Sequence, residues 1–123
     1  MTRAIHFLAQ RDFSRPFFLN ISFARPHSPY VPPQPYFDYY DRMELPEPHI
    51  GDWAEMFDRP VTSVNAWCGR LSPRRVHRAR AGYYGEINFI DTQIGRLMNW
   101  LRRHQPEGLP EHLVSVHLGP RGI

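Results

Sequence analysis

The chain has 123 residues and a formal net charge of +3, and arginine supplies all of its strongly basic side chains, since lysine is absent. This length suits one domain, and the single cysteine excludes an internal disulfide and a cysteine-rich zinc site. No apolar run reaches the roughly 20 residues of a membrane helix, and the first residues are too polar for a signal peptide, so a cytoplasmic location is the default expectation.

The first expected elements are the end of a helix and a buried strand. Ala4, Phe7 and Leu8 lie at helical spacing and predict the last turns of a helix. Residues 17–23 place alternate apolar side chains on one face and the bulky Phe18 on the other. An apolar strand covered on both faces is typical of the parallel sheet of an α/β fold.

A proline-rich segment follows this strand. Five prolines between residues 26 and 35 predict a stiff, extended backbone. Residues 36–42 predict a short helix rich in tyrosine. Residues 43–77 show no sustained period and carry scattered prolines and glycines, which predicts a long loop or variable insertion.

The strongest helix signal lies in residues 83–101, where apolar residues recur at spacings of four and three. This expected apolar face consists of Tyr83, Ile87, Ile90, Ile94, Leu97 and Leu101. Arginines 102 and 103 complement the helix C-terminus, and Pro106 ends the helix. The apolar segment 112–118 has the composition of a final strand.

His27 is the first candidate for a functional residue. Ligands of open α/β sheets bind outside the carboxyl ends of strands, and His27 follows the expected strand closely. Pro26 and Pro29 restrict the backbone around it, which suits an imidazole that hydrogen-bonds or protonates a substrate oxygen. On position alone, a histidine that only caps a turn is an equal alternative.

The other candidates carry weaker signals. Arginines near Cys68 would favour its thiolate, but a lone cysteine in an unpatterned loop is more often inert. A basic cluster precedes the long helix and consists of Arg70, Arg74, Arg75, His77, Arg78 and Arg80. It would suit phosphate, sulfate or nucleic acid, yet no nucleic-acid motif accompanies it, which favours a solvated loop. The remaining histidines lack metal-ligand spacing.

Two segments together resemble the type I sulfatases of the alkaline-phosphatase superfamily. The stretch "RPFFLNISFARPHSPYVPPQPYFDYYD" is similar to the family's strand, Pro-His-x-Pro sequence, proline-rich turn and tyrosine-containing helix. The stretch "YYGEINFIDTQIGRLMNWL", residues 83–101, is similar to the family helix that follows, with its Asp and its Ile-Gly-Arg-Leu. Two motifs in the family order are more specific than either motif alone.

The resemblance implies an alkaline-phosphatase-like α/β fold, a largely parallel sheet flanked by helices, of which residues 1–104 would be a part. It implies hydrolysis of sulfate monoesters, of small molecules or of sulfated glycans, by a formylglycine beside a divalent cation, usually calcium. His27 matches by position the histidine that contacts the sulfate group and assists the leaving oxygen. Asp91 and Arg96 match the helix motif, where packing and hydrogen-bonding roles are expected.

Several family motifs are missing from the chain. There is no Cys/Ser-x-Pro-x-Arg, because Cys68 precedes Gly-Arg-Leu, and the acidic metal ligands, the active-site lysine and Ser-Asp-His-Gly are absent. Residues 111–122 can be written in synonymous codons that, read from the second base, give Asn-Thr-Trp-Leu-Val-Phe-Thr-Ser-Asp-His-Gly. We therefore interpret residues 105–123 as an out-of-frame tail, in which His112 and His117 have no evolved function.

The leading hypothesis is an internal fragment of a sulfatase that is inactive alone, with no nucleic-acid or membrane partner. A phosphomonoester or phosphonate-ester hydrolase of the same superfamily is an alternative parent, because sulfate and phosphate esters share a tetrahedral geometry. A small basic interaction protein that uses its proline-rich loop is an alternative of another class, and it predicts binding that weakens with salt.

Overall fold

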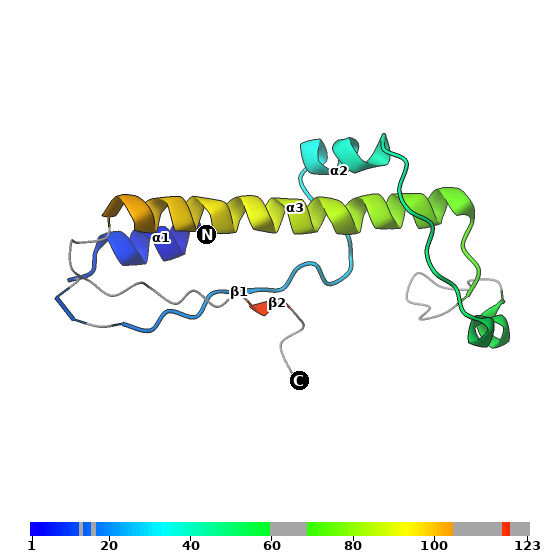
Figure 1. The fold of residues 1–123 in the computed structure, drawn as a ribbon, viewed down its shortest axis with the longest axis horizontal. Coiled ribbons are helices and arrows are strands. Elements are labelled where there is room, and N and C mark those ends of the chain that lie inside the picture. The colour runs from blue at the N-terminus through cyan, green and yellow to red at the C-terminus, as the bar shows by residue number, and fades with distance from the viewer. Residues whose placement is uncertain (13, 16, 60–68, 105–116, 119–123) are drawn as a thin grey trace.

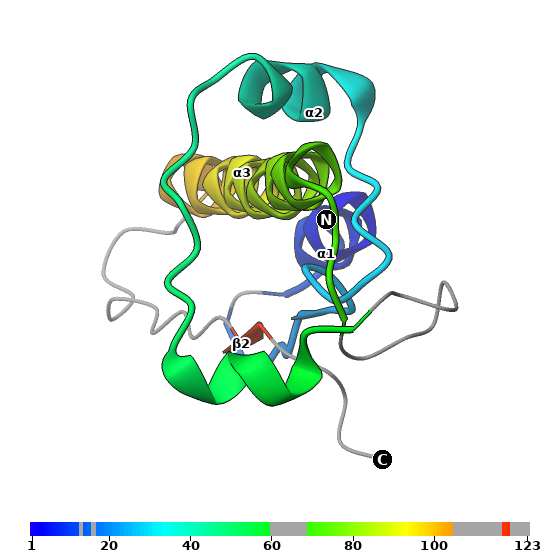
Figure 2. The ribbon, with the colours of Figure 1, turned by 90° about the vertical axis from the view of Figure 1, so that its right-hand side faces the viewer.

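A computed structural model describes residues 1–12, 14–15, 17–59, 69–104 and 117–118. The central element is one long helix, α3 (Pro73–His104), and α2 and α1 lie on different sides of it (Figures 1 and 2). The other elements are α1 (Thr2–Ala9), β1 (Ser22–Phe23), α2 (Gln34–Asp41), the 3-10 helix η1 (Asp52–Phe57) and β2 (His117–Leu118). In the ranges just given, no helix combines the length and the apolar character needed to cross a membrane.

Helix α3 begins well before its first periodic apolar residue. The amide of Arg75 donates to Ser72 Oγ at 3.4 Å, and the amide of Val76 donates to the Ser72 carbonyl at 3.0 Å. Pro73 then takes the first helical position, where an N–H would have no helical partner in any case. The prediction that a loop extends to residue 77 was therefore wrong at that end, because Pro73 starts a helix.

The hydrophobic core lies where α1 packs against the C-terminal half of α3. Leu8 is buried against Leu97 and Leu101, and full burial of each such side chain stabilises the fold by about 1.5–3 kcal/mol. The partly buried side chains around these three are Met1, Ile5, Phe17, Leu19, Ile21, Met98 and Trp100. The alternation predicted for residues 17–23 is therefore confirmed for the three residues that reach this core.

The strand in this segment is much shorter than predicted. Ser22 and Phe23 pair in parallel with His117 and Leu118, and each strand has two residues. Within the described ranges, the sheet consists of β1 and β2 alone, and a strand extends only as far as a neighbour supplies hydrogen-bond partners. Phe18 is 90% exposed, so the expected cover on both faces is absent there. A largely parallel sheet is not confirmed.

Helix α2 confirms the tyrosine-rich helix expected at residues 36–42. Tyr36 meets Phe89 edge to face at a centroid distance of 5.3 Å, and Tyr40 lies 5.7 Å from Tyr84. Aromatic pairs of this kind contribute about 0.5–1.5 kcal/mol beyond their buried area. The tyrosines of α2 therefore attach it to the middle of α3.

Candidate functional site

The proline-rich loop after β1 crosses α3 at a notch formed by Ala81, Gly82 and Gly85, all three buried. A Cβ on Gly82 would lie 2.9 Å from the Cβ of Tyr30, and one on Gly85 would lie 2.9 Å from Cγ of Pro32. Contacts this close exclude a larger residue unless the loop moves. The small residues of the notch therefore let the loop pack directly on the helix.

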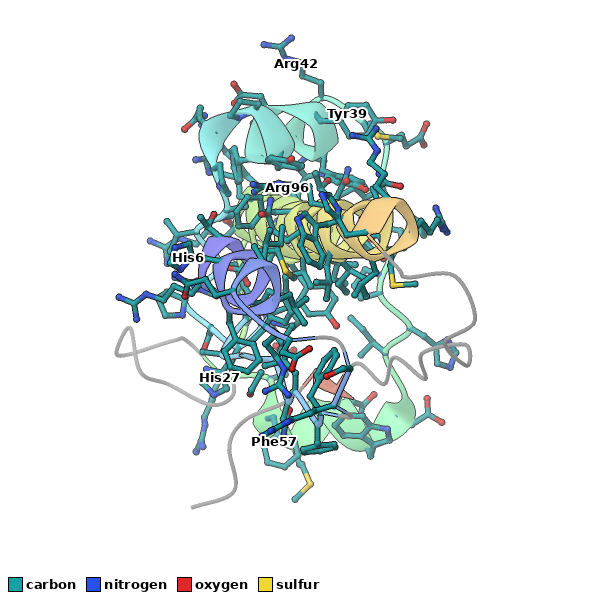
Figure 3. The ribbon with its side chains drawn as sticks, turned by 90° about the vertical axis from the view of Figure 1, so that its left-hand side faces the viewer. His6, His27, Tyr39, Arg42, Phe57 and Arg96 are labelled. Atoms are coloured by element: carbon teal, nitrogen blue, oxygen red, sulfur yellow. The ribbon has the colours of Figure 1, made fainter. Side chains whose placement is uncertain are left out.

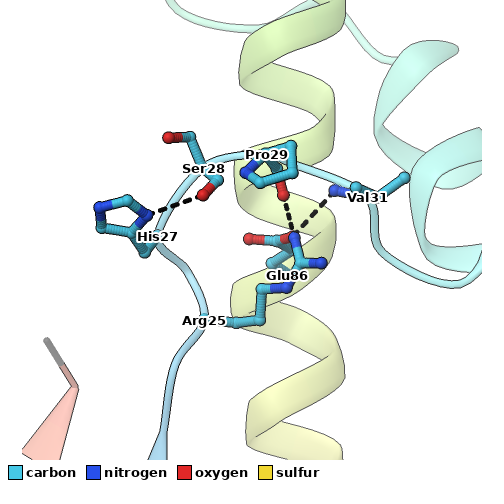
Figure 4. Close-up of polar contacts among 6 residues, drawn as sticks. All are labelled: Arg25, His27, Ser28, Pro29, Val31 and Glu86. Atoms are coloured by element: carbon cyan, nitrogen blue, oxygen red, sulfur yellow. Dashed lines mark hydrogen bonds and ion pairs between the residues drawn. The ribbon is translucent and has the colours of Figure 1, made fainter. Parts of the chain in front are cut away.

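Glu86 binds the loop beside this notch. Its side chain is 2% exposed, and its Oε1 accepts hydrogen bonds from the amide of Val31 at 2.9 Å and from the Arg25 guanidinium (Figure 4). Arg25 also donates to the carbonyl of Pro29. One buried carboxylate therefore holds the loop on both sides of His27.

His27 lies between these two attachment points, and its ring is on the side of the loop away from α3 (Figure 4). The residue is exposed, and its backbone amide donates to the carbonyl of Ala24 at 3.3 Å. Its Nδ1 lies 2.7 Å from the carbonyl oxygen of Ser28. Because a carbonyl can only accept, Nδ1 carries the proton and Nε2 of the neutral ring keeps a lone pair. A turn-capping contact thus occupies one ring nitrogen, and no described residue forms a hydrogen bond with the other.

Three members of the basic cluster at the start of α3, Arg70, His77 and Arg78, contact Asp58 or Asp41. Arg70 makes two hydrogen bonds to the Asp58 carboxylate. His77 Nε2 lies 3.0 Å from the backbone carbonyl of Asp41, and Arg78 lies 3.9 Å from the carboxylate of Asp41. These contacts neutralise part of the cluster and connect α3 to α2. They favour a structural role for the cluster over a nucleic-acid interface.

Two other positions of the helix motif, Asp91 and Arg96, are exposed on α3. Arg96 donates to Gln93 within the same helix at 2.8 Å, which is the hydrogen-bonding role expected of it. Both side chains are exposed, so the packing role expected at these two positions is not seen among the described residues. His27 lies on the side of α3 opposite to Tyr39 and Arg42 of the α2 region (Figure 3).

Glu86 was missed by the sequence analysis, because an acidic residue in a helix is normally solvent-facing. The spacing of the sequence nonetheless indicates that Glu86 faces inward. Glu86 stands four residues after Gly82 and four before Ile90, and all three are buried. Residues at this spacing share one helical face, so the position of Glu86 marks it as inward-facing.

A divalent cation does not fit the residues in the part of the chain that the structure describes. There, no group of three or more His, Cys, Asp or Glu side chains is placed to hold a metal ion. The buried acid Glu86 is engaged by Arg25 and Val31. Cys68 and His112 lie outside the described ranges.

Comparison with known proteins gives a consistent set of matches. A family model described as Sulfatase matches residues 1–107. The chain is 47% identical over 100 residues to an arylsulfatase of Clostridium perfringens (strain 13 / Type A), covering 80% of this chain and 21% of that protein. It is 29% identical over 120 residues to a choline-sulfatase of Rhizobium meliloti (strain 1021), covering 89% and 23%.

A further match has a broader name. The chain is 29% identical over 115 residues to the multifunctional alkaline phosphatase superfamily protein PehA of Trinickia caryophylli, covering 80% of this chain and 22% of that protein. In all three cases, the chain spans roughly a fifth of the length of the curated relative that it matches.

Proposed function

Because the chain belongs to the sulfatase family, we propose that it is one part of a sulfate-ester hydrolase in which His27 contacts the sulfate group. Members of this family generally use a formylglycine nucleophile and a divalent metal ion. The observation that supports the proposal for His27 is its exposed imidazole, held on a loop that α3 fixes at Arg25 and Val31. Its Nδ1 contacts the Ser28 carbonyl, and the ring points away from α3 (Figure 4), so in this proposal Nε2 meets the ligand.

The step assigned to His27 is proton transfer to the leaving oxygen. Hydrolysis of a sulfate monoester breaks the bond between sulfur and the ester oxygen, water supplies the new oxygen on sulfur, and the leaving oxygen needs a proton to depart as an alcohol or phenol. The protonated ring donates that proton from Nε2. The Ser28 carbonyl accepts from Nδ1 throughout, so the ring keeps its orientation when its charge changes.

The first substrate class is a small sulfate monoester, in line with relatives named arylsulfatase and choline-sulfatase. Hydrolysis of phosphate or phosphonate esters is the second candidate. It is supported by the match to the multifunctional alkaline phosphatase superfamily protein. Both ester types present tetrahedral oxygens to the same histidine, so His27 alone does not select between them.

We further propose that the chain is a fragment without activity of its own. Its sequence contains no Cys/Ser-x-Pro-x-Arg from which a formylglycine is made. Residues 105–123 form an out-of-frame tail in this proposal, and DNA sequencing of the locus tests it. An alternate frame that encodes Asn-Thr-Trp-Leu-Val-Phe-Thr-Ser-Asp-His-Gly supports the tail, and any other reading there contradicts it.

A chimera tests the role of His27. Residues 17–104 of this chain replace the matching segment of the Clostridium perfringens arylsulfatase, and hydrolysis of 4-nitrophenyl sulfate and 4-nitrophenyl phosphate is measured. We expect faster turnover of the sulfate and a loss of kcat of about 10²–10⁴-fold in His27→Ala. His49→Ala is the control, because that histidine is also exposed. An unchanged kcat in His27→Ala contradicts the proposal, and faster turnover of the phosphate favours the second candidate.

A further inference from the structure

We infer that Glu86 is a positioning residue, which fixes the loop that presents His27 without contacting the substrate itself. The role of His27 in this inference rests on the proposed function. The role of Glu86 rests on the geometry alone. Glu86 comes from the middle of α3, and its two partners on the loop are 55 and 61 positions earlier in the chain. In the described ranges, no other element forms side-chain hydrogen bonds to the loop both before and after His27.

The two attachments restrain the loop in different ways. The hydrogen bond from Val31 fixes the backbone after His27 at 2.9 Å, and it needs only an acceptor at Glu86. The contact from Arg25 fixes the residue before the Pro-His sequence, and the negative charge of Glu86 strengthens it. Arg25 also donates to Pro29, so its guanidinium links both arms of the turn around His27.

Burial makes this arrangement sensitive to charge. Glu86 is 2% exposed, and within the described residues its Oε2 is buried with no hydrogen-bond partner. A buried carboxylate in this state depends on the guanidinium for compensation, and removal of one member leaves the other uncompensated. The loop and helix are therefore coupled by an ion pair that forms only when the loop lies in the notch.

A purely structural role for Glu86 makes a different prediction. If Glu86 only stabilised α3, its loss would loosen the helix and the loop together. If Glu86 positions the loop, its loss frees the loop while the buried part of α3, including Ile90, stays protected. Hydrogen exchange separates these outcomes, because it reports local opening residue by residue.

The experiment compares the full chain with its Glu86→Ala, Glu86→Gln and Asp91→Asn variants by NMR, without any sulfate ester. Amide exchange is measured at Val31 and Ile90, and the ring nitrogen signals of His27 are recorded. Asp91→Asn removes a negative charge from an exposed position of the same helix and is the matched control. Since no ester is present, the result does not depend on the chimera, whose activity tests the proposed function.

We expect Glu86→Ala to accelerate Val31 exchange by about tenfold or more, to leave Ile90 within about twofold, and to shift the His27 ring signals. Glu86→Gln restores Val31 protection through its amide oxygen but leaves the ring signals shifted, because Arg25 has lost its charged partner. Asp91→Asn changes neither readout. An unprotected Val31 in the unmodified chain, unchanged Val31 exchange and ring signals in Glu86→Ala, or equal acceleration at Val31 and Ile90 would each overturn the inference.

Discussion

Gly82 and Tyr30 are in direct contact: a Cβ at Gly82 would lie 2.9 Å from both the Cβ and the carbonyl oxygen of Tyr30. Gly82→Ala adds this atom to a site without room for it. Helix propensity alone would favour alanine by about 1 kcal/mol. A net fall in the free energy of unfolding therefore reports the clash with Tyr30. We expect the free energy of unfolding in urea to fall by about 1–3 kcal/mol, as overpacking usually costs.

Gly95→Ala is the matched control on the same helix, because a Cβ there would meet no atom of the described residues within 4 Å. Its free energy of unfolding should rise by up to about 1 kcal/mol through helix propensity alone. Equal effects of the two substitutions would contradict the close packing of the loop in the notch.

Truncation of the core at Leu97 should be costly. Leu97 is buried against Leu8 and Leu101, so Leu97→Ala should lower the free energy of unfolding by about 2–5 kcal/mol. Phe18→Ala removes a larger side chain that is 90% exposed and should change this free energy by less than about 0.5 kcal/mol. A larger loss at Phe18 than at Leu97 would show that the core lies elsewhere.

The pair of Asp58 and Arg70 predicts a pH effect. Hydrogen bonds from Arg70 hold the pKa of Asp58 below its usual value, and Asp58 raises the pKa of Arg70. Since the folded-state pKa of Asp58 is lowered, the stability that the pair contributes is present above the unfolded value of about 3.9. It is lost as the pH falls through the lower folded value. Both side chains are exposed, so the contribution is small and weakens with salt.

Carboxyl NMR titration checks this pH effect directly. Arg70→Ala should return the pKa of Asp58 towards its usual value, whereas Arg75→Ala, from the same basic cluster, should leave it low. If the pKa of Asp58 stays equally low in both variants, Arg70 is not the cause of the shift.

Removal of the Ser72 side chain should fray the first turn of α3. Its Oγ accepts from the amide of Arg75 at 3.4 Å, and loss of an N-cap side chain costs about 1 kcal/mol. Circular dichroism at 222 nm and urea unfolding should report this loss in Ser72→Ala. Ser72→Asp keeps an acceptor at the helix N-terminus and should retain full stability. If Ser72→Ala is as stable as the unmodified chain, then Pro73 alone defines the N-terminus of α3.

Helix α3 was predictable from its sequence where its buried residues are large and apolar. Ile90, Leu97 and Leu101 carry the helical period, and all three are buried. Towards the N-terminus the buried face consists of glycine, alanine and a glutamate, which a pattern of apolar residues does not reveal. What fills that face is a loop about fifty positions earlier, so the packing there depends on tertiary contacts.

The candidate site, like α3, was predictable from the sequence only in part. The position of His27 followed from an apolar run and its prolines, both local signals. The roles of Glu86 and Arg25 did not follow, because an ion pair between residues 61 positions apart leaves no trace in local sequence. The length of β1 was overestimated for a related reason, since a strand extends only as far as its neighbours do.

The contacts described for the His27 loop come from α3, and the connection between α2 and α3, of which the structure describes residues 42–59 and 69–72, is a separate segment. Closing a flexible loop becomes costlier only slowly with length, and each doubling adds about 0.6 kcal/mol. Because the histidine loop is fixed to α3 by Gly82 and Glu86, this connection can lengthen, shorten or change composition while the imidazole stays in place. The fold thereby separates a part that must remain constant from a neighbouring part that is free to vary, and new recognition elements can be added there at small thermodynamic cost.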